Sequence, residues 1–141
     1  MKEEIDDRTL RIYLSRYRRS RERKKELEDR IASLRKELGA EEKTTSVKFQ
    51  VEEISERIEK EKKEMARNVT EIMDLISYTP ADSIERSILE MRHIDCMEWT
   101  EIARHVHMTR TPCNKYYKKG LQEILGNKRA RKILQDYRKR T

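Results

Sequence analysis

The chain has 141 residues, of which 34 are Lys or Arg and 27 are Asp or Glu, and its formal net charge is +7. Charged residues make up 43% of the chain and hydrophobic residues 35%, with only 3 Gly and 2 Pro. This composition excludes a turn-rich all-β fold and an enzyme with a large apolar core, and it predicts an all-α protein of long, solvated helices. The positive balance favours a polyanionic partner.

The sequence shows no sign of secretion or of membrane insertion. The first segment, MKEEIDDRTL, is acidic and lacks an apolar signal core, and no stretch is apolar enough to span a membrane. Cys96 and Cys113 form no CxxC pair. We therefore expect reduced thiols, a cytoplasmic protein and no membrane partner.

Residues 5–38 predict one long helix with a coiled-coil seam. Its apolar members recur at alternating spacings of three and four residues, and they are Leu10, Tyr13, Tyr17, Leu27, Ile31, Leu34 and Leu38. Ser20 and Lys24 are polar members of the same seam. Residues 16–25 carry seven basic side chains against one acidic. We interpret this cluster as a solvated face, and contact with DNA or with an acidic protein surface stays open.

A second seam follows a break at Gly39 and predicts a second long helix. Its apolar members are Val47, Val51, Ile54, Ile58, Met65, Ile72 and Leu75, with Glu61 and Asn68 as polar members. Two seams joined by a short loop favour an antiparallel helical hairpin over residues 1–79. The alternative is that each helix pairs with another copy of the chain. A homodimer built on the hairpin is compatible with both readings.

Pro80 marks the next boundary, because proline disfavours helix at the residue before it and suits the first turn of a new helix. The seven-residue rhythm is lost beyond it, and shorter apolar clusters predict several helices around a small core in residues 80–127. Gly126 is expected to end the last of them. Residues 128–141 carry seven basic side chains against one acidic, and form a basic tail or a short helix.

Residues 99–119 have the spacing of a helix-turn-helix. Ile102 lies on the buried face of the first helix, and Ala103 is small enough for the two helices to cross closely. His107 falls in the turn, where a left-handed backbone is expected. Thr109 suits the N-cap of the second helix.

The outward face of the second helix is basic and has no acidic residue before Glu123. Carboxylates would repel phosphate oxygens, so this face predicts binding to duplex DNA. Arg110 suits a guanine edge and Asn114 an adenine edge, whereas lysines suit phosphates. Gly120 stands where a helix former is expected. The candidate DNA-binding residues are Thr109, Arg110, Thr111, Asn114, Lys115, Lys118 and Lys119 in this helix, and Lys128, Arg129, Arg131 and Lys132 in the C-terminal segment.

Catalytic patterns are missing from the sequence. It contains no Ser/His/Asp set, Gly-rich phosphate loop or paired carboxylates in a plausible pocket, so we expect neither catalysis nor a cofactor. His93, Cys96, His105, His107 and Cys113 match no standard zinc-ligand spacing, so we expect no metal site. A small helical bundle that makes no DNA contact is the alternative reading.

The segment LEMRHIDCMEWTEIARHVHMTR resembles the helix-turn-helix of sigma-70 region 4. Together with TLRIYLSRYR near the start, it makes the chain similar to RinA/ArpU-like phage transcriptional regulators. The resemblance implies a phage regulator that recognises a promoter or operator in the host-cell cytoplasm, and it leaves open a contact with RNA polymerase. The alternative functions are a protein-interaction scaffold built on the hairpin and an RNA-binding antiterminator.

Overall fold

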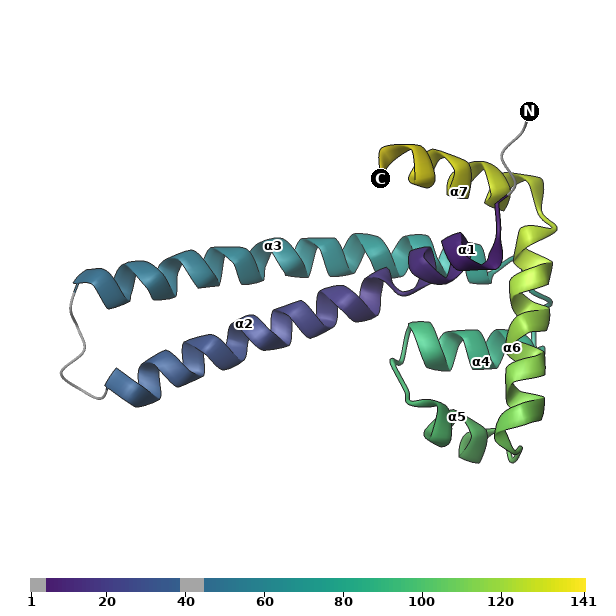
Figure 1. Ribbon diagram of the computed structural model, residues 1–141, viewed down its shortest axis with the longest axis horizontal. Coiled ribbons are helices and arrows are strands. Elements are labelled where there is room, and N and C mark those ends of the chain that lie inside the picture. Colours follow the sequence, from purple (N-terminus) through teal and green to yellow (C-terminus); the bar gives the residue numbers. More distant parts are fainter. Residues whose placement is uncertain (1–4, 39–44) are drawn as a thin grey trace.

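A computed structural model describes residues 5–38 and 45–141, which contain seven helices and no strand. Two long helices form an arm, and shorter helices gather in a head at one end of it (Figure 1). The helices are α1 Asp7–Leu14, α2 Arg16–Leu38, α3 Thr45–Ile76, α4 Ile84–His93, α5 Trp99–His105, α6 Arg110–Leu125 and α7 Lys128–Arg140. The predicted all-α fold, with a long hairpin followed by shorter helices, is confirmed.

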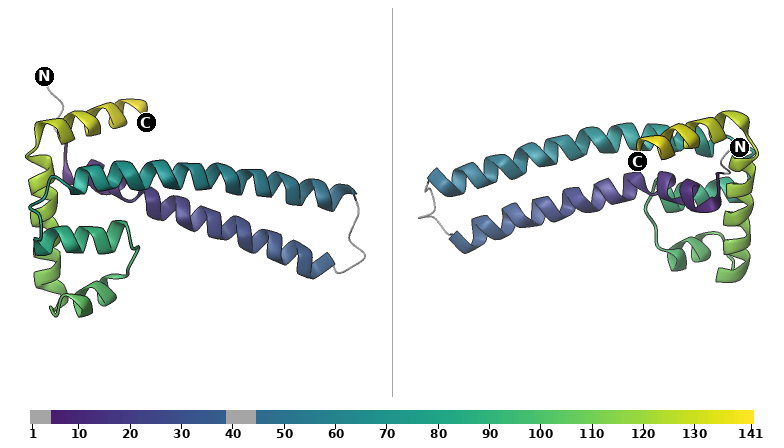
Figure 2. Two further views of the ribbon diagram at one scale, coloured as in Figure 1. Left: turned by 180° about the vertical axis from the view of Figure 1, so that it is seen from behind. Right: turned by 45° about the horizontal axis from the view of Figure 1, so that its top comes forward.

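The arm is an antiparallel pair in which α2 lies along α3 within one chain (Figure 2). Leu27, Ile31 and Ile58 are buried between the two helices, and Val51 and Ile54 pack against them. These residues belong to the two predicted seams, so burial of the seams joins the helices. The predicted break at Gly39 lies outside the described residues.

A polar layer interrupts the apolar seam where the arm enters the head. Asn68 Nδ2 donates to Ser20 Oγ at 3.2 Å, and Arg16 Nη1 donates to Asn68 Oδ1 at 3.2 Å. Ser20 and Asn68 are both buried. Farther along the arm, Arg23 Nε donates to Glu61 Oε1 at 2.9 Å. Of the polar members of the two predicted seams, Ser20 and Asn68 therefore bond to each other, whereas Glu61 pairs with Arg23, which lies outside the predicted seam.

Residues 5–38 form two helices, and the prediction of a single helix is wrong. The chain bends at Ser15, between α1 and α2. Arg16 Nε donates to the Tyr13 carbonyl at 3.0 Å, which satisfies an acceptor that a continuous helix would use for its backbone. The bend turns α1 into the head, where its apolar face joins the core.

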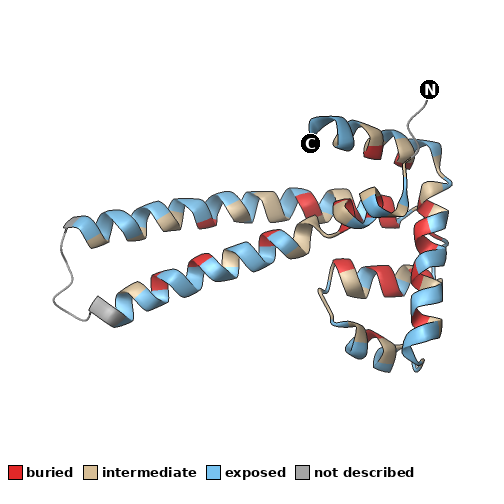
Figure 3. Ribbon diagram, viewed as in Figure 1, coloured by how far each residue is buried: buried red, intermediate tan, exposed pale blue. Residues whose placement is uncertain are grey.

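The head has one core, to which helices from both ends of the chain contribute. Buried residues concentrate there and are sparser along the arm (Figure 3). The large apolar side chains with no exposed surface are Leu10, Leu14, Ile72, Leu75, Ile88, Leu89, Ile102, Leu121, Ile124 and Leu134. These come from α1, the end of α3, and α4 to α7, so α1 and the arm's base are built into the same core as the C-terminal helices.

Helix α4 begins at Ile84 and not at Pro80 as predicted. The Arg86 backbone N–H donates to Ser83 Oγ at 3.1 Å, so the serine caps the helix and the proline precedes it in a turn. Gly126 follows the end of α6, as predicted. The basic C-terminal segment is the helix α7.

Candidate nucleic-acid interface

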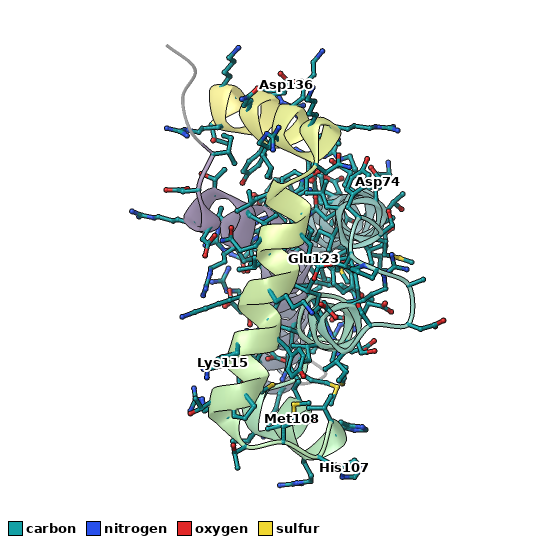
Figure 4. The ribbon with its side chains drawn as sticks, turned by 90° about the vertical axis from the view of Figure 1, so that its right-hand side faces the viewer. Asp74, His107, Met108, Lys115, Glu123 and Asp136 are labelled. Atoms are coloured by element: carbon teal, nitrogen blue, oxygen red, sulfur yellow. The ribbon has the colours of Figure 1, made fainter. Side chains whose placement is uncertain are left out.

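Helix α6 crosses the end of the head opposite the arm, and its outward side is not covered by another helix of the described chain (Figures 1 and 4). Its inner stripe is buried, and comprises Cys113, Tyr117, Gly120, Leu121 and Ile124. These positions recur at three- and four-residue spacing, so they share one side of the helix. Burial of this side holds the opposite side in solvent.

The turn between α5 and α6 has a Schellman motif. His107 is left-handed, with φ of 55°, and the Met108 backbone N–H donates to the Ala103 carbonyl at 3.0 Å. The left-handed backbone predicted for His107 is confirmed. Thr109 occupies the N-cap of α6, but its side chain makes no capping hydrogen bond.

The first half of α6 presents an exposed stripe of hydrogen-bond donors, which we call the α6 stripe. It consists of Arg110, Thr111, Asn114, Lys115 and Lys118. Within the described part of the chain, none of these side chains has a hydrogen bond or an ion pair. No acidic residue occurs on α6 before Glu123. A polyanion can therefore reach these donors without displacing an internal partner.

Lys119 differs from the stripe because it pairs with the protein itself. Its Nζ lies 3.2 Å from Oε2 of Glu85, an α4 residue that is 4% exposed. Burial raises the pKa of Glu85, but hydrogen bonds from Glu123, from the backbone, from Ser83 and from Lys119 outweigh it and hold that pKa below its ordinary value. Burial and the Glu85 carboxylate raise the pKa of Glu123. Lys119 thus offsets the charge of this carboxyl pair.

Gly120 allows α6 to lie directly against α4. A Cβ atom at this position would lie 2.7 Å from Leu89 Cδ1 and 3.3 Å from Glu85 Cβ. Leu89 is fully buried, so it has little room to move away. The glycine that departs from a helix-forming pattern therefore has a packing role.

A buried histidine joins the helices behind the α6 stripe. His93 is 3% exposed, and its Nε2 lies 2.8 Å from Tyr117 Oη. The Tyr117 ring in turn meets Trp99 edge-on, with 4.9 Å between the ring centroids. Burial lowers the pKa of His93 to about 3 and raises the pKa of Tyr117 to about 12. Both groups are therefore neutral near pH 7 and hold α4, α5 and α6 together.

The four candidate residues of the C-terminal segment lie apart from the α6 stripe. Lys128, Arg129 and Lys132 are exposed on α7, whereas Arg131 Nη1 donates to the Leu125 carbonyl at 2.8 Å. Helix α7 follows the C-terminal end of α6, and the 16 residues of α6 span about 24 Å. The structure therefore divides the predicted residues into two surfaces.

Three exposed residues beside the start of α6 were not in the predicted set. Arg104 and His105 end α5, and His107 lies in the turn. Figure 4 shows His107 at the same end of the head as the start of α6. Their proximity to the helix-turn-helix turn is the sequence signal that would have found them.

Three cations of the basic cluster of residues 16–25 contact other helices of the protein. Arg16 and Arg23 bond to side chains of α3, and Arg18 Nη2 pairs with Glu98 Oε1 at 3.1 Å. These contacts join α2 to α3 and to the start of α5. Arg19, Arg21 and Lys25 of this cluster are exposed, in keeping with the predicted solvated face, and contact with DNA or with another protein stays open.

Among the described residues, no group of three or more His, Cys, Asp or Glu is placed to hold a metal ion. None of the described helices combines the length and apolarity that crossing a membrane requires. Comparison of the chain with protein-family models, with curated proteins and with solved structures finds no match. The resemblance to sigma-70 region 4 and to RinA/ArpU-like regulators stays a prediction from the motif.

Proposed function

We propose that this protein binds duplex DNA sequence-specifically through the first half of α6 and acts as a transcriptional regulator. The observation that carries the proposal is the α6 stripe. Its donors are exposed and have no partner within the described chain, and no carboxylate accompanies them before Glu123. A helix that is buried on one side and polar on the other fits the major groove, which is about 12 Å wide.

The side chains of the stripe divide into two roles. Arg110 offers a bidentate fork to a guanine edge and Asn114 offers an amide to an adenine edge, each contributing about 1–3 kcal/mol of discrimination. Lys115 and Lys118 contact phosphates, which set the position of the helix without reading sequence. The hydroxyl of Thr111 is suited to either contact.

The residues and helices around the α6 stripe support an orientation in which α6 faces the DNA. Arg104, His105 and His107 lie beside the start of α6, where the flanking phosphates would pass. The arm extends from the opposite side of the head, so it leaves the approach to α6 open (Figures 1 and 2). In this arrangement the arm is free to contact a second copy of the chain or RNA polymerase. The phage-type role and the promoter or operator target rest on the sequence resemblance.

Selection of bound sequences from random duplex DNA with the full chain tests the proposal. We expect an enriched motif, and a palindromic motif would indicate a two-fold dimer. A chain that enriches no motif, or that prefers single-stranded RNA, contradicts sequence-specific duplex binding. Binding of neither nucleic acid would favour the interaction-scaffold alternative.

Substitutions in the α6 stripe separate its two roles. Arg110→Ala is expected to relax base preference at one position of the motif. Lys118→Gln is expected to weaken binding to all duplexes alike and to make the log–log salt slope shallower by about 0.9. A salt slope that Lys118→Gln leaves unchanged would contradict the phosphate role.

A further inference from the structure

Helix α7 carries a second cationic surface, which we call the α7 face. Its exposed cations include Lys128, Arg129, Lys132, Lys139 and Arg140, and Asp136 is the exposed acid among them. We propose that the α7 face binds the phosphate backbone of a second duplex segment, separate from the one read by α6. The proposal rests on the proposed function of the α6 stripe and adds a second DNA partner to it.

Packing of α7 against the head fixes the direction of this face. Ala130 and Leu134 are buried on the inner side of the helix. The Tyr137 ring meets Tyr13 edge-on, with 5.1 Å between centroids, and the Arg16 guanidinium lies 5.3 Å from the Tyr137 ring. Because the inner side is anchored to α1, the cations share the opposite, solvent-facing side.

The cations of the α7 face are spaced to follow a phosphate backbone. Lys128 and Lys139 are eleven positions apart in a continuous helix, which corresponds to about 17 Å. Phosphates of one strand succeed each other by about 3.4 Å along the duplex axis, so the face spans roughly five of them. Lysine and arginine on phosphates carry no sequence information, so we expect this contact to be sequence-independent.

The α7 face leads away from the outward side of α6, because α7 runs from the C-terminal end of α6 back over the arm (Figure 1). The α6 stripe lies at the other end of α6, about 24 Å away along the helix axis, and faces away from the arm. Acidic groups lie between them: Gln122 Nε2 donates to Asp7 Oδ1 at 3.0 Å, and Glu123 follows on α6. Figure 4 shows Glu123 on α6 between Lys115 and α7. A duplex held by the α6 stripe therefore leaves the α7 face open to another.

Förster resonance energy transfer between two short duplexes tests the proposal. One duplex carries the donor fluorophore and the other carries the acceptor fluorophore. Both carry the sequence selected by the full chain. The test variant is Arg129→Gln/Lys132→Gln/Lys139→Gln. The control variant, Arg57→Gln/Lys60→Gln/Lys63→Gln, removes the same charge from exposed positions of α3.

We expect transfer with the wild type and the control, and loss of transfer with the α7 variant. The α7 variant should keep the affinity and base preference of the one-duplex complex. Three results would overturn the proposal. They are no transfer with the wild type, transfer that survives in the α7 variant, and a one-duplex complex that is weaker in the α7 variant than in the wild type and has a shallower salt slope. Failure of the α6 function is recognised in the one-duplex complex of the wild type, which would then show no base preference, whereas failure of the α7 proposal leaves that preference intact.

Discussion

At the scale of single residues, buried and half-buried polar groups connect helices that are distant in the sequence. Arg16 is the clearest case. It donates to Asn68 on α3, and its guanidinium lies 3.8 Å from the centroid of the Tyr13 ring and 5.3 Å from that of Tyr137. One side chain thus links the arm with α1 and α7. His93 has the same role among the helices behind α6.

The burial of His93 predicts a pH dependence of stability. Its folded-state pKa of about 3 lies below the ordinary value of 6.5, so the unfolded chain takes up the proton first. The free energy of unfolding should therefore fall as the pH drops from about 6.5 towards 3, with a slope of up to about 1.4 kcal/mol per pH unit. Denaturant unfolding at several pH values measures this slope.

His93→Gln should remove this contribution between pH 6.5 and 5, above the range in which ordinary carboxylates titrate. His105→Gln, at an exposed position, is the matched control and should keep the wild-type slope. Equal slopes in the wild type and in His93→Gln would show that His93 is not held neutral by burial.

At the scale of helices, the contact between α4 and α6 sets the position of the α6 stripe. Gly120→Ala adds a methyl group 2.7 Å from Leu89 Cδ1. Although alanine favours a helix, we expect overpacking to prevail and to destabilise the protein by about 1–3 kcal/mol.

Gly126→Ala is the control, because φ there is −72° and the nearest neighbours of the new Cβ lie 3.4 Å away. It should be neutral or stabilise by up to about 1 kcal/mol. Thermal and denaturant unfolding compare the two variants, and equal stabilities would contradict the packing role of Gly120.

The polar layer of the arm predicts an energetic coupling between α2 and α3. Asn68→Ala removes the acceptor for Arg16 and the donor for Ser20, and should cost about 1–3 kcal/mol. In a double-mutant cycle with Ser20→Ala, the two costs should be non-additive by at least about 0.5 kcal/mol. Thr70→Ala, at an exposed position of α3, should change stability by less than about 0.5 kcal/mol. Additive costs for Asn68 and Ser20 would contradict their pairing.

Local patterns predict elements better than they predict the contacts between them. The seams predicted the arm because a three- and four-residue spacing is a property of one helix, and His107 and Gly126 were readable as helix ends. The bend at Ser15 and the pairing of Lys119 with Glu85 depend on packing against distant parts of the chain. Charge alone led us to group the basic residues of α7 with those of α6 in one predicted DNA-binding set. The structure places the α7 residues at the other end of α6.

At the scale of the whole molecule, the arm and α6 lie at opposite ends. Helix α3 has 32 residues, so it extends about 48 Å. One end of it is buried in the head core, and the other projects away from α6 (Figure 1). A DNA-bound head would therefore hold the arm away from the duplex, where it can meet a protein partner.

The base preference of Asn114→Ala tests the central proposal most directly. Affinity for the selected duplex is divided by affinity for a scrambled duplex of equal length, at one salt concentration. We expect Asn114→Ala to lower this ratio by roughly 5- to 150-fold, which corresponds to about 1–3 kcal/mol. Gln50→Ala, which removes an exposed amide from the arm, should leave it unchanged. A ratio that is the same in Asn114→Ala and in the wild type would contradict the assignment of α6 as the recognition helix.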